Sequence, residues 1–215
     1  MRRRKRRILE AATKLISDGG IEACTMRALA RKARLDVTTL YNYYGSKEEI
    51  LEALRRSGAR KLERRIGSLE ETEPIDRIRA IVDLMLGVRE SPADLARPIN
   101  LPGPRRRPGS GPIAVVAREH LERELHRAAA GGDLIPSVDL KQLALAILGP
   151  AGVWLPLWAR GVVTAEETAA RVGHFVSLCL LAAATDVSRP GLERAMLESQ
   201  HELATIDAAR AAAAV

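Results

Sequence analysis

Cysteine is scarce in this 215-residue chain, and the two that occur, Cys24 and Cys179, stand far apart. They form neither the paired spacing of a zinc site nor a disulfide framework, and each lies within an apolar helical pattern. We therefore expect two buried free thiols and a protein of a reducing compartment.

Long uninterrupted hydrophobic runs are also missing. Glu10 and Thr13 break up the apolar residues that follow the basic N-terminus, so no secretory signal is recognisable there. Residues 143–159 carry no charge, but two glycines and two prolines interrupt this stretch, which is marginal in length for a membrane span. We expect a buried helix pair at an interface, a cytoplasmic location and no membrane partner.

Residue patterns that carry catalysis or bind metals are missing too. The sequence has no nucleophile elbow, no Gly-rich phosphate loop and no zinc-protease signature. The four histidines do not form a short metal-ligand pattern: His120, His126, His174 and His201. We expect no catalytic site, no metal and no cofactor.

Positive charge is what the chain does have. Against 27 Asp and Glu stand 34 Lys and Arg, a net charge of +7, which favours a polyanionic partner such as nucleic acid or an acidic membrane surface. The charge gathers toward the N-terminus, in an unbroken basic run at residues 2–7 and a second cluster at residues 55–65. The N-terminal end is therefore the cationic end.

Apolar residues recur at helical spacing along the chain, and no strand alternation or repeat competes with them. In the N-terminal third, the pattern predicts a first helix stopped by Asp18-Gly19-Gly20, and others at residues 25–33, 37–44 and 46–66. Thr25 is the expected cap of the second helix. Ser46 and Glu49 form an expected capping box, in which the glutamate reaches back to the cap.

The remaining pattern predicts helices at residues 75–86, 113–130, 137–160, 165–185 and 189–211. Prolines and glycines crowd the segment near residues 98–112, where we expect a mobile loop, with Arg105, Arg106 and Arg107 solvated in it. The fold should be all-α, with a small domain at residues 1–52, including a basic tail at 1–7, and a larger helical domain at residues 53–215.

A helix-turn-helix requires two short helices joined by a tight turn, the second entering a major groove about 12 Å wide. Residues 37–44 suit the second helix because they are rich in hydroxyl, amide and phenol groups. Leu40 would face inward, while Thr38, Tyr41 and Asn42 would point outward with Val37. Asn42 could read an adenine, and Val37 could touch a thymine methyl.

Over about residues 5–55 the order and spacing of motifs resemble the TetR-family DNA-binding domain. The matching segments are Asp18-Gly19-Gly20-Ile21-Glu22-Ala23, Thr25-Met26-Arg27-Ala28-Leu29-Ala30, Ala33-Arg34-Leu35 and Thr39-Leu40-Tyr41-Asn42-Tyr43-Tyr44-Gly45-Ser46-Lys47-Glu48-Glu49-Ile50-Leu51. The family usually has a glycine where Arg34 stands. This departure implies either a left-handed non-glycine residue or a different turn.

The resemblance implies roles for individual residues. Thr25 and Lys47 stand where members of the family hold DNA phosphates, and Arg27 stands where some reach a base. Tyr41 and Tyr43 are implied phosphate or sugar contacts. The implied reading face comprises Val37, Thr38, Thr39, Tyr41, Asn42 and Tyr43. Beside this head, the basic run at residues 2–7 is either a solvated tail or, as its position favours, an electrostatic contact with DNA.

For the second domain, the resemblance implies a four-helix dimer interface and a pocket for an effector. The expected interface residues are Leu143, Ile147, Trp158, Phe175, Val176 and Cys179. The expected effector residues are Met85, Leu86, Arg89, His120 and Trp154, although core or dimer packing is an alternative for the aromatic residues.

These observations predict a homodimeric repressor that binds double-stranded operator DNA and is released by an unidentified small-molecule effector. One alternative is an architectural protein that binds DNA without sequence preference. Another is a helical enzyme with a DNA-binding head.

Overall fold

The computed structural model describes residues 2–88 and 111–213, and its regular secondary structure is helical throughout this part. The expected all-α class is confirmed, with an isolated bridge between Leu134 and Ala184 as the strand-like pairing described. The helices are α1 (Arg2–Ala23), α2 (Met26–Ala33), α3 (Val37–Tyr43), α4 (Lys47–Gly67), α5 (Pro74–Leu86), α7 (Pro112–Ala130), α8 (Leu140–Leu148), α9 (Ala151–Ala159), α10 (Ala165–Ala182) and α11 (Arg189–Ala213).

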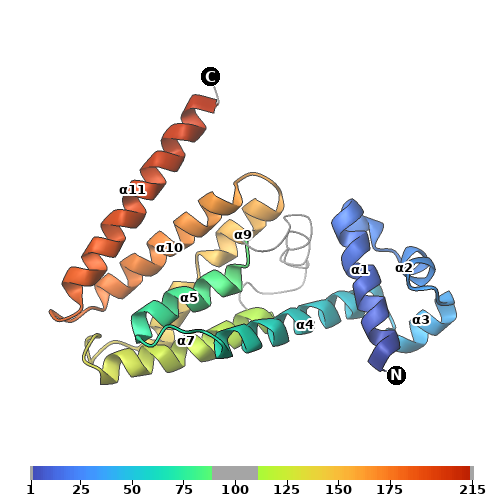
Figure 1. Cartoon of the computed structure of the whole chain (residues 1–215), viewed down its shortest axis with the longest axis horizontal. Helices are drawn as coiled ribbons and strands as arrows, with labels where there is room; N and C mark the ends of the chain where they lie inside the picture. Colours follow the sequence, from blue (N-terminus) through green and yellow to red (C-terminus); the bar gives the residue numbers. More distant parts are fainter. Residues whose placement is uncertain (1, 89–110, 214–215) are drawn as a thin grey trace.

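Figure 1 shows a small head of α1–α3 joined through the rod of α4 to a larger helical body, along one side of which α11 extends. Each part has its own hydrophobic core. Helix α4 contributes Ile50, Leu51 and Leu54 to the head core and Leu62 and Ile66 to the body core. The division expected between residues 52 and 53 therefore falls inside one continuous helix.

The first helix differs from the expectation at both ends. The basic run expected as a tail is helical from Arg2 onward. It is anchored because Ile8 is fully buried in the head core, Arg6 pairs with Glu10 at 3.2 Å, and Arg7 donates to the backbone carbonyl of Ala33. At its other end, the glycines kink the helix, with Gly20 at a φ of 73°, and a further turn runs on to Ala23.

Local capping chemistry sets the helix starts in the head. The Thr25 hydroxyl accepts the Ala28 amide at 3.2 Å, and the Ser46 hydroxyl accepts the Glu49 amide at 3.2 Å. The Glu49 carboxylate reaches back to the amide of Gly45, at 3.1 Å, rather than to that of Ser46 as a capping box would have it. Both predicted N-caps are confirmed.

In the turn between α2 and α3, Arg34 adopts the left-handed conformation, the first of the two possibilities that its place in the sequence implied. Its φ and ψ of 51° and 54° are left-handed, so a non-glycine residue takes the place that glycine favours. The turn closes because the Leu35 amide donates to the carbonyl of Ala30 at 2.9 Å.

In the body, the single helix expected at residues 137–160 is two helices, α8 and α9, separated at Gly149 and Pro150. Proline has no amide hydrogen and its ring crowds the preceding turn, so the helix breaks there. The other expected helices agree with α5, α7, α10 and α11 to within a few residues. Most of the loop predicted at 98–112, including Arg105, Arg106 and Arg107, lies outside the described residues.

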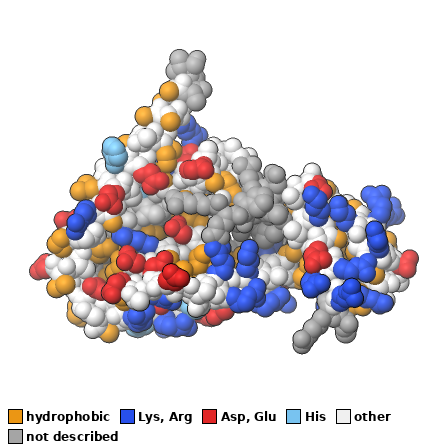
Figure 2. All heavy atoms as spheres, in the orientation of Figure 1, with side chains coloured by type: hydrophobic (Ala, Val, Ile, Leu, Met, Phe, Trp, Pro, Cys, Tyr) orange, Lys and Arg blue, Asp and Glu red, His pale blue; other side chains and the backbone are white. Residues whose placement is uncertain are grey.

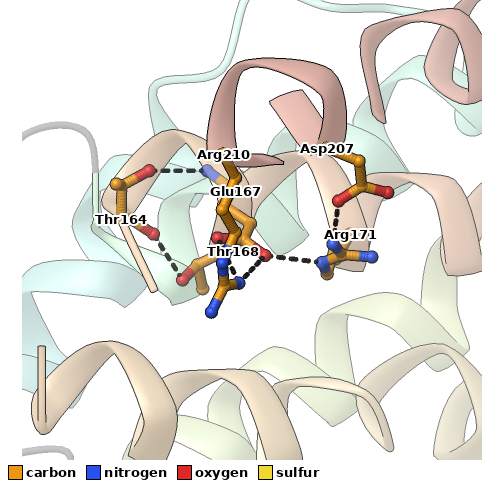
Figure 3. A network of polar contacts seen from close by, with 6 residues as sticks. All are labelled: Thr164, Glu167, Thr168, Arg171, Asp207 and Arg210. Atoms are coloured by element: carbon orange, nitrogen blue, oxygen red, sulfur yellow. Dashed lines mark hydrogen bonds and ion pairs between the residues drawn. The ribbon is translucent and has the colours of Figure 1, made fainter. Parts of the chain in front are cut away.

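A network of charged groups fastens α11 to α10 (Figure 3). The Glu167 carboxylate, whose side chain is 4% exposed, accepts from Arg171 Nε at 3.0 Å and from Arg210 Nη1 at 3.0 Å. Arg171 also pairs with Asp207 and lies over the Trp154 ring, 4.8 Å from its centroid. One buried carboxylate thus holds two guanidinium groups, one of them from the far half of α11.

We expect Glu167→Gln to loosen the C-terminal half of α11, by about 2 kcal/mol, because charge-assisted hydrogen bonds become neutral ones. Hydrogen–deuterium exchange should then speed up at residues 200–212. Glu202→Gln, at an exposed position of the same helix, is the matched control and should leave the exchange unchanged. Equal exchange in both variants would contradict the fastening role.

We expect Arg34→Gly to raise the free energy of unfolding by about 1 kcal/mol, because the left-handed conformation is strained for arginine and relaxed for glycine. Urea unfolding followed by circular dichroism measures the change. The matched control is Arg31→Gly, at an exposed arginine within α2, which should instead lose about 1 kcal/mol. A loss of stability at Arg34 would show that its side chain makes contacts that outweigh the strain.

Candidate nucleic-acid interface

Helix α3 is held by one buried residue and presents its other side to solvent. Leu40 is fully buried in the head core. Val37 and Tyr41 are 37% and 49% exposed, and Thr38 and Asn42 are exposed as well. The helix therefore has the orientation that the sequence predicted, with amide, hydroxyl and phenol groups outward.

Two of the predicted contact residues are less accessible. Thr39 is half-buried, and Tyr43 is half-buried where it packs against the head core. Tyrosine combines an apolar ring with a polar tip, so the contact of Tyr43 with a phosphate or sugar stays a prediction. Tyr43 and Thr39 thus lie at the margin of the exposed face rather than at its centre.

Three further predicted residues surround α3 from neighbouring helices. Thr25 and Arg27 are exposed at the start of α2. Lys47 stands in the first turn of α4, where its ammonium group lies 3.8 Å from a Glu22 carboxylate oxygen. The Glu22 side chain is 92% exposed and can move away without breaking other packing, so Lys47 is available to an incoming phosphate.

Several acidic groups of the head, among them Glu10, Asp18 and Glu22, pair with its basic side chains, and the basic groups that are left over make its surface cationic. Asp18 lies between Lys14, at 2.9 Å, and Lys32, at 3.6 Å, and its hydrogen bond to Lys14 lowers the pKa of the carboxyl group. Arginine side chains of the head stay in excess, and Figure 2 shows Lys and Arg gathered over this end of the molecule. A surface of this kind attracts the phosphate backbone.

Neither cysteine has the lowered pKa and the exposure of a reactive thiol. Burial raises the pKa of the Cys24 thiol in the head and of the Cys179 thiol in the body. Cys24 is fully buried, as expected, whereas Cys179 is only half-buried. Raised pKa values keep both thiols protonated and poorly nucleophilic at neutral pH.

Most residues expected at a dimer interface lie instead inside the body core. Leu143, Ile147, Trp158 and Val176 are all less than 10% exposed and pack within this chain, so they are not accessible to a partner. Phe175, by contrast, is 44% exposed on α10. Phe175 and the half-buried Cys179 are the expected interface residues that keep exposed surface, and the location of the interface stays a prediction.

Three further apolar residues on α8, α9 and α10, which the sequence did not single out, are also exposed. Leu145 on α8 is 48% exposed, Val153 on α9 is 59% exposed, and Leu178 on α10 is 39% exposed. We call these residues, with Phe175, the apolar patch. The stretch Leu140–Ala159 is also long and apolar enough to cross a membrane, a weak indication because core helices of soluble proteins pass the same test. Of its apolar 18-residue window, 28% is buried inside the structure.

The expected effector residues differ in their surroundings among the described residues. Met85 and Leu86 are buried in the body core, and Trp154 on α9 packs against that core beneath Arg171. His120 bonds to Glu63 of α4 at 3.1 Å and to Arg123 at 3.0 Å. Arg89 lies outside the described residues.

A hollow of about 280 Å³ lies elsewhere, between α5, α10 and α11, with Arg79, Ser177 and Glu198 in its lining. None of the expected effector residues lines it. Within the described part of the chain, no group of three or more His, Cys, Asp or Glu side chains is placed to hold a metal ion.

Comparison with known proteins places the head in a family. Residues 8–54 match the model described as bacterial regulatory proteins, tetR family. The transcriptional repressor KstR of Rhodococcus jostii is 35% identical over 79 residues, 37% of each chain. KstR of Mycobacterium tuberculosis is 47% identical over 60 residues, 27% of each chain. The chain thus spans about a third of the length of the curated relatives it matches.

Solved structures resemble the chain over most of its length. The regulator FadR from Bacillus subtilis, in complex with stearoyl-CoA, has a TM-score of 0.64 at 17% identity and covers 81% of this chain and 96% of its own. RolR in complex with resorcinol has a TM-score of 0.63 at 14% identity, covering 90% and 93%. At these identities the likeness concerns the fold alone.

The matched helix-turn-helix and the shared helical fold of the body point the same way. Residues 8–54 thus form a helix-turn-helix domain of the tetR family of bacterial regulatory proteins, and the chain as a whole shares the fold of solved regulators of transcription.

Proposed function

We propose that the protein is a homodimeric transcriptional repressor that binds an operator through α3 and releases it when a small ligand binds the body. The observation that carries this proposal is the orientation of α3, anchored by the fully buried Leu40 with Thr38, Tyr41 and Asn42 exposed. An isolated helix face of this kind fits a major groove. The named relatives are repressors, which supports the same role.

Within this proposal the head residues divide into two groups. Asn42, Val37, Thr38 and Arg27 read bases, while Tyr41, Tyr43, Thr25 and Lys47 hold phosphates or sugars. Thr39 lies at the edge of the reading face. Only the first group discriminates among sequences.

The apolar patch supports self-association. Its four members are exposed on α8, α9 and α10, and exposed large apolar side chains favour an interface with another protein surface. A second copy of the chain would place two α3 helices on one operator, with half-sites about 34 to 36 Å apart or a multiple of that spacing. The same contact accounts for the exposed apolar face of Leu140–Ala159 without a membrane.

Helix α4 would transmit the response. Its packing against α7 is close at Gly58, where an added Cβ would stand 3.2 Å from the side chain of Ile113, and the Glu63–His120 bond links the same two helices. A ligand that shifts α7 would therefore turn α4 and the head with it. Ligand and operator should weaken each other reciprocally, because the coupling is a single free energy.

Structural neighbours bind ligands as different as stearoyl-CoA and resorcinol, which supports ligand response without naming one for this chain. We propose a cytoplasmic, non-enzymatic regulator, because the relatives are named as regulators of transcription.

The proposal is tested by selecting bound fragments from a random DNA library and titrating the best site against scrambled DNA. A repressor should recover a pseudo-palindrome with a specificity ratio of about a thousandfold or more. Recovery of no motif, with binding that vanishes as salt rises, would favour the architectural alternative.

On the selected operator, we expect Asn42→Ala to reduce discrimination at one base pair by about 1 to 3 kcal/mol. Tyr41→Ala should instead weaken operator and scrambled DNA alike, because it removes a backbone contact. Competition titrations measure both effects, with Gln142→Ala in the body as the control. Unchanged discrimination without Asn42 would remove its assignment as a base reader.

We expect Phe175→Glu to convert the dimer to a monomer, because it places a charge within the apolar patch. Light scattering coupled to size exclusion measures the mass. Val187→Glu, at a position 82% exposed outside that patch, is the matched control and should stay dimeric. A dimeric Phe175→Glu variant would locate the interface elsewhere.

A further inference from the structure

A second hollow, of about 430 Å³, opens beside the reading helix in the head. It lies between the first turns of α1, the end of α2, the turn after it and α3. Its lining is mostly polar and includes three arginines from separate segments: Arg4, Arg31 and Arg34. The sequence did not indicate this grouping, because Arg4 stands 27 positions from Arg31.

The three guanidinium groups have no carboxylate partner among the described residues. No ion pair joins Arg4, Arg31 or Arg34 to an acidic side chain of the described chain, although the neighbouring Arg6, Lys14 and Lys32 are paired. Asp36 is the one acidic residue in the lining, and its side chain makes no capping bond to α3. The hollow therefore has an excess of two positive charges, and an anion would relieve the repulsion between them.

The backbone positions of Arg4 and Arg34 are fixed by contacts of the segments that carry them. Arg4 belongs to helix α1, which is anchored nearby by the bond from Arg7 to the Ala33 carbonyl and by Lys5, whose ammonium lies 5.8 Å from the centre of the Tyr44 ring. Arg34 is held left-handed, with its amide bonded to the Arg31 carbonyl at 3.2 Å. Positions set in advance reduce the entropy lost when the side chains bind.

We infer that Arg4, Arg31 and Arg34 form a phosphate clamp that grips the DNA backbone at the margin of the groove entered by α3. Thr39 of α3 lines the same hollow, so the clamp adjoins the reading face directly. This inference rests on the proposed function and extends each half-site by phosphate contacts that carry no base information. A polynucleotide fits better than a small anion, because the exposed α3 face continues from the hollow's edge.

The helical conformation of the basic run sets the position of Arg4. In a disordered tail, Arg4 would sample many positions and contribute to DNA binding only through its average charge. As part of α1, it stands opposite the turn that carries Arg34. The clamp therefore depends on a contact between the first helix and the helix-turn-helix.

The salt dependence of DNA binding tests the clamp, because each phosphate contact adds about 0.9 to the slope of log K against log salt. We would compare the full chain with Arg4→Gln, Arg31→Gln and Arg34→Gly. Each variant should bind the selected operator and scrambled DNA about fivefold more weakly at 0.1 M salt, lower the slope by about one, and keep the specificity ratio.

Arg194→Gln, at an exposed arginine of α11, matches the charge change and should leave affinity and slope as in the parent chain. Arg34→Gly also separates binding from folding, because it should weaken DNA binding while the head is as stable or more so. Slopes equal to the parent's in all three clamp variants would overturn the clamp. Failure of the parent chain to select any operator would overturn the proposed function instead, while the slopes on random DNA would still measure the clamp.

Discussion

Helix α4 belongs to two hydrophobic cores at once, and the arrangement of the whole molecule depends on this constraint. Its first half is buried with the head helices through Ile50, Leu51 and Leu54, and its second half with the body through Leu62 and Ile66. A helix is stiff over this length, so a rotation imposed at one end appears at the other. The head can therefore respond to the body without a flexible joint between them.

The head combines this rigid attachment with an uneven use of charge. Several of its acidic side chains pair with nearby lysines and arginines, as Asp18 does with Lys14 and Lys32, and so neutralise part of the basic surface. Arginines at the hollow beside α3 have no such partners among the described residues. Charge left unpaired at a surface costs little in water and is ready for a phosphate.

The body differs from the head in that it exposes large apolar side chains outside its core. Helices α8, α9 and α10 place one side in the core and leave Leu145, Val153, Phe175 and Leu178 outside. Glu167 is buried and bonded to two arginines, which attaches the far half of α11 with directional bonds in addition to the core packing of Leu192 near its start. Association of two chains would complete the apolar burial.

The sequence by itself determined the all-α class, the caps at Thr25 and Ser46, and the inward position of Leu40, because caps and helical periodicity are local signals. The sequence also offered a left-handed backbone at Arg34 as one of two possibilities, and the structure has that conformation. Only the tertiary structure decided which side of the charge-free stretch faces the core, since a run without polar residues has no periodicity to read. The meeting of Arg4, Arg31 and Arg34 was likewise decided by the packing of α1 against α2, because contacts between distant residues are set by how helices pack and not by their spacing in the chain.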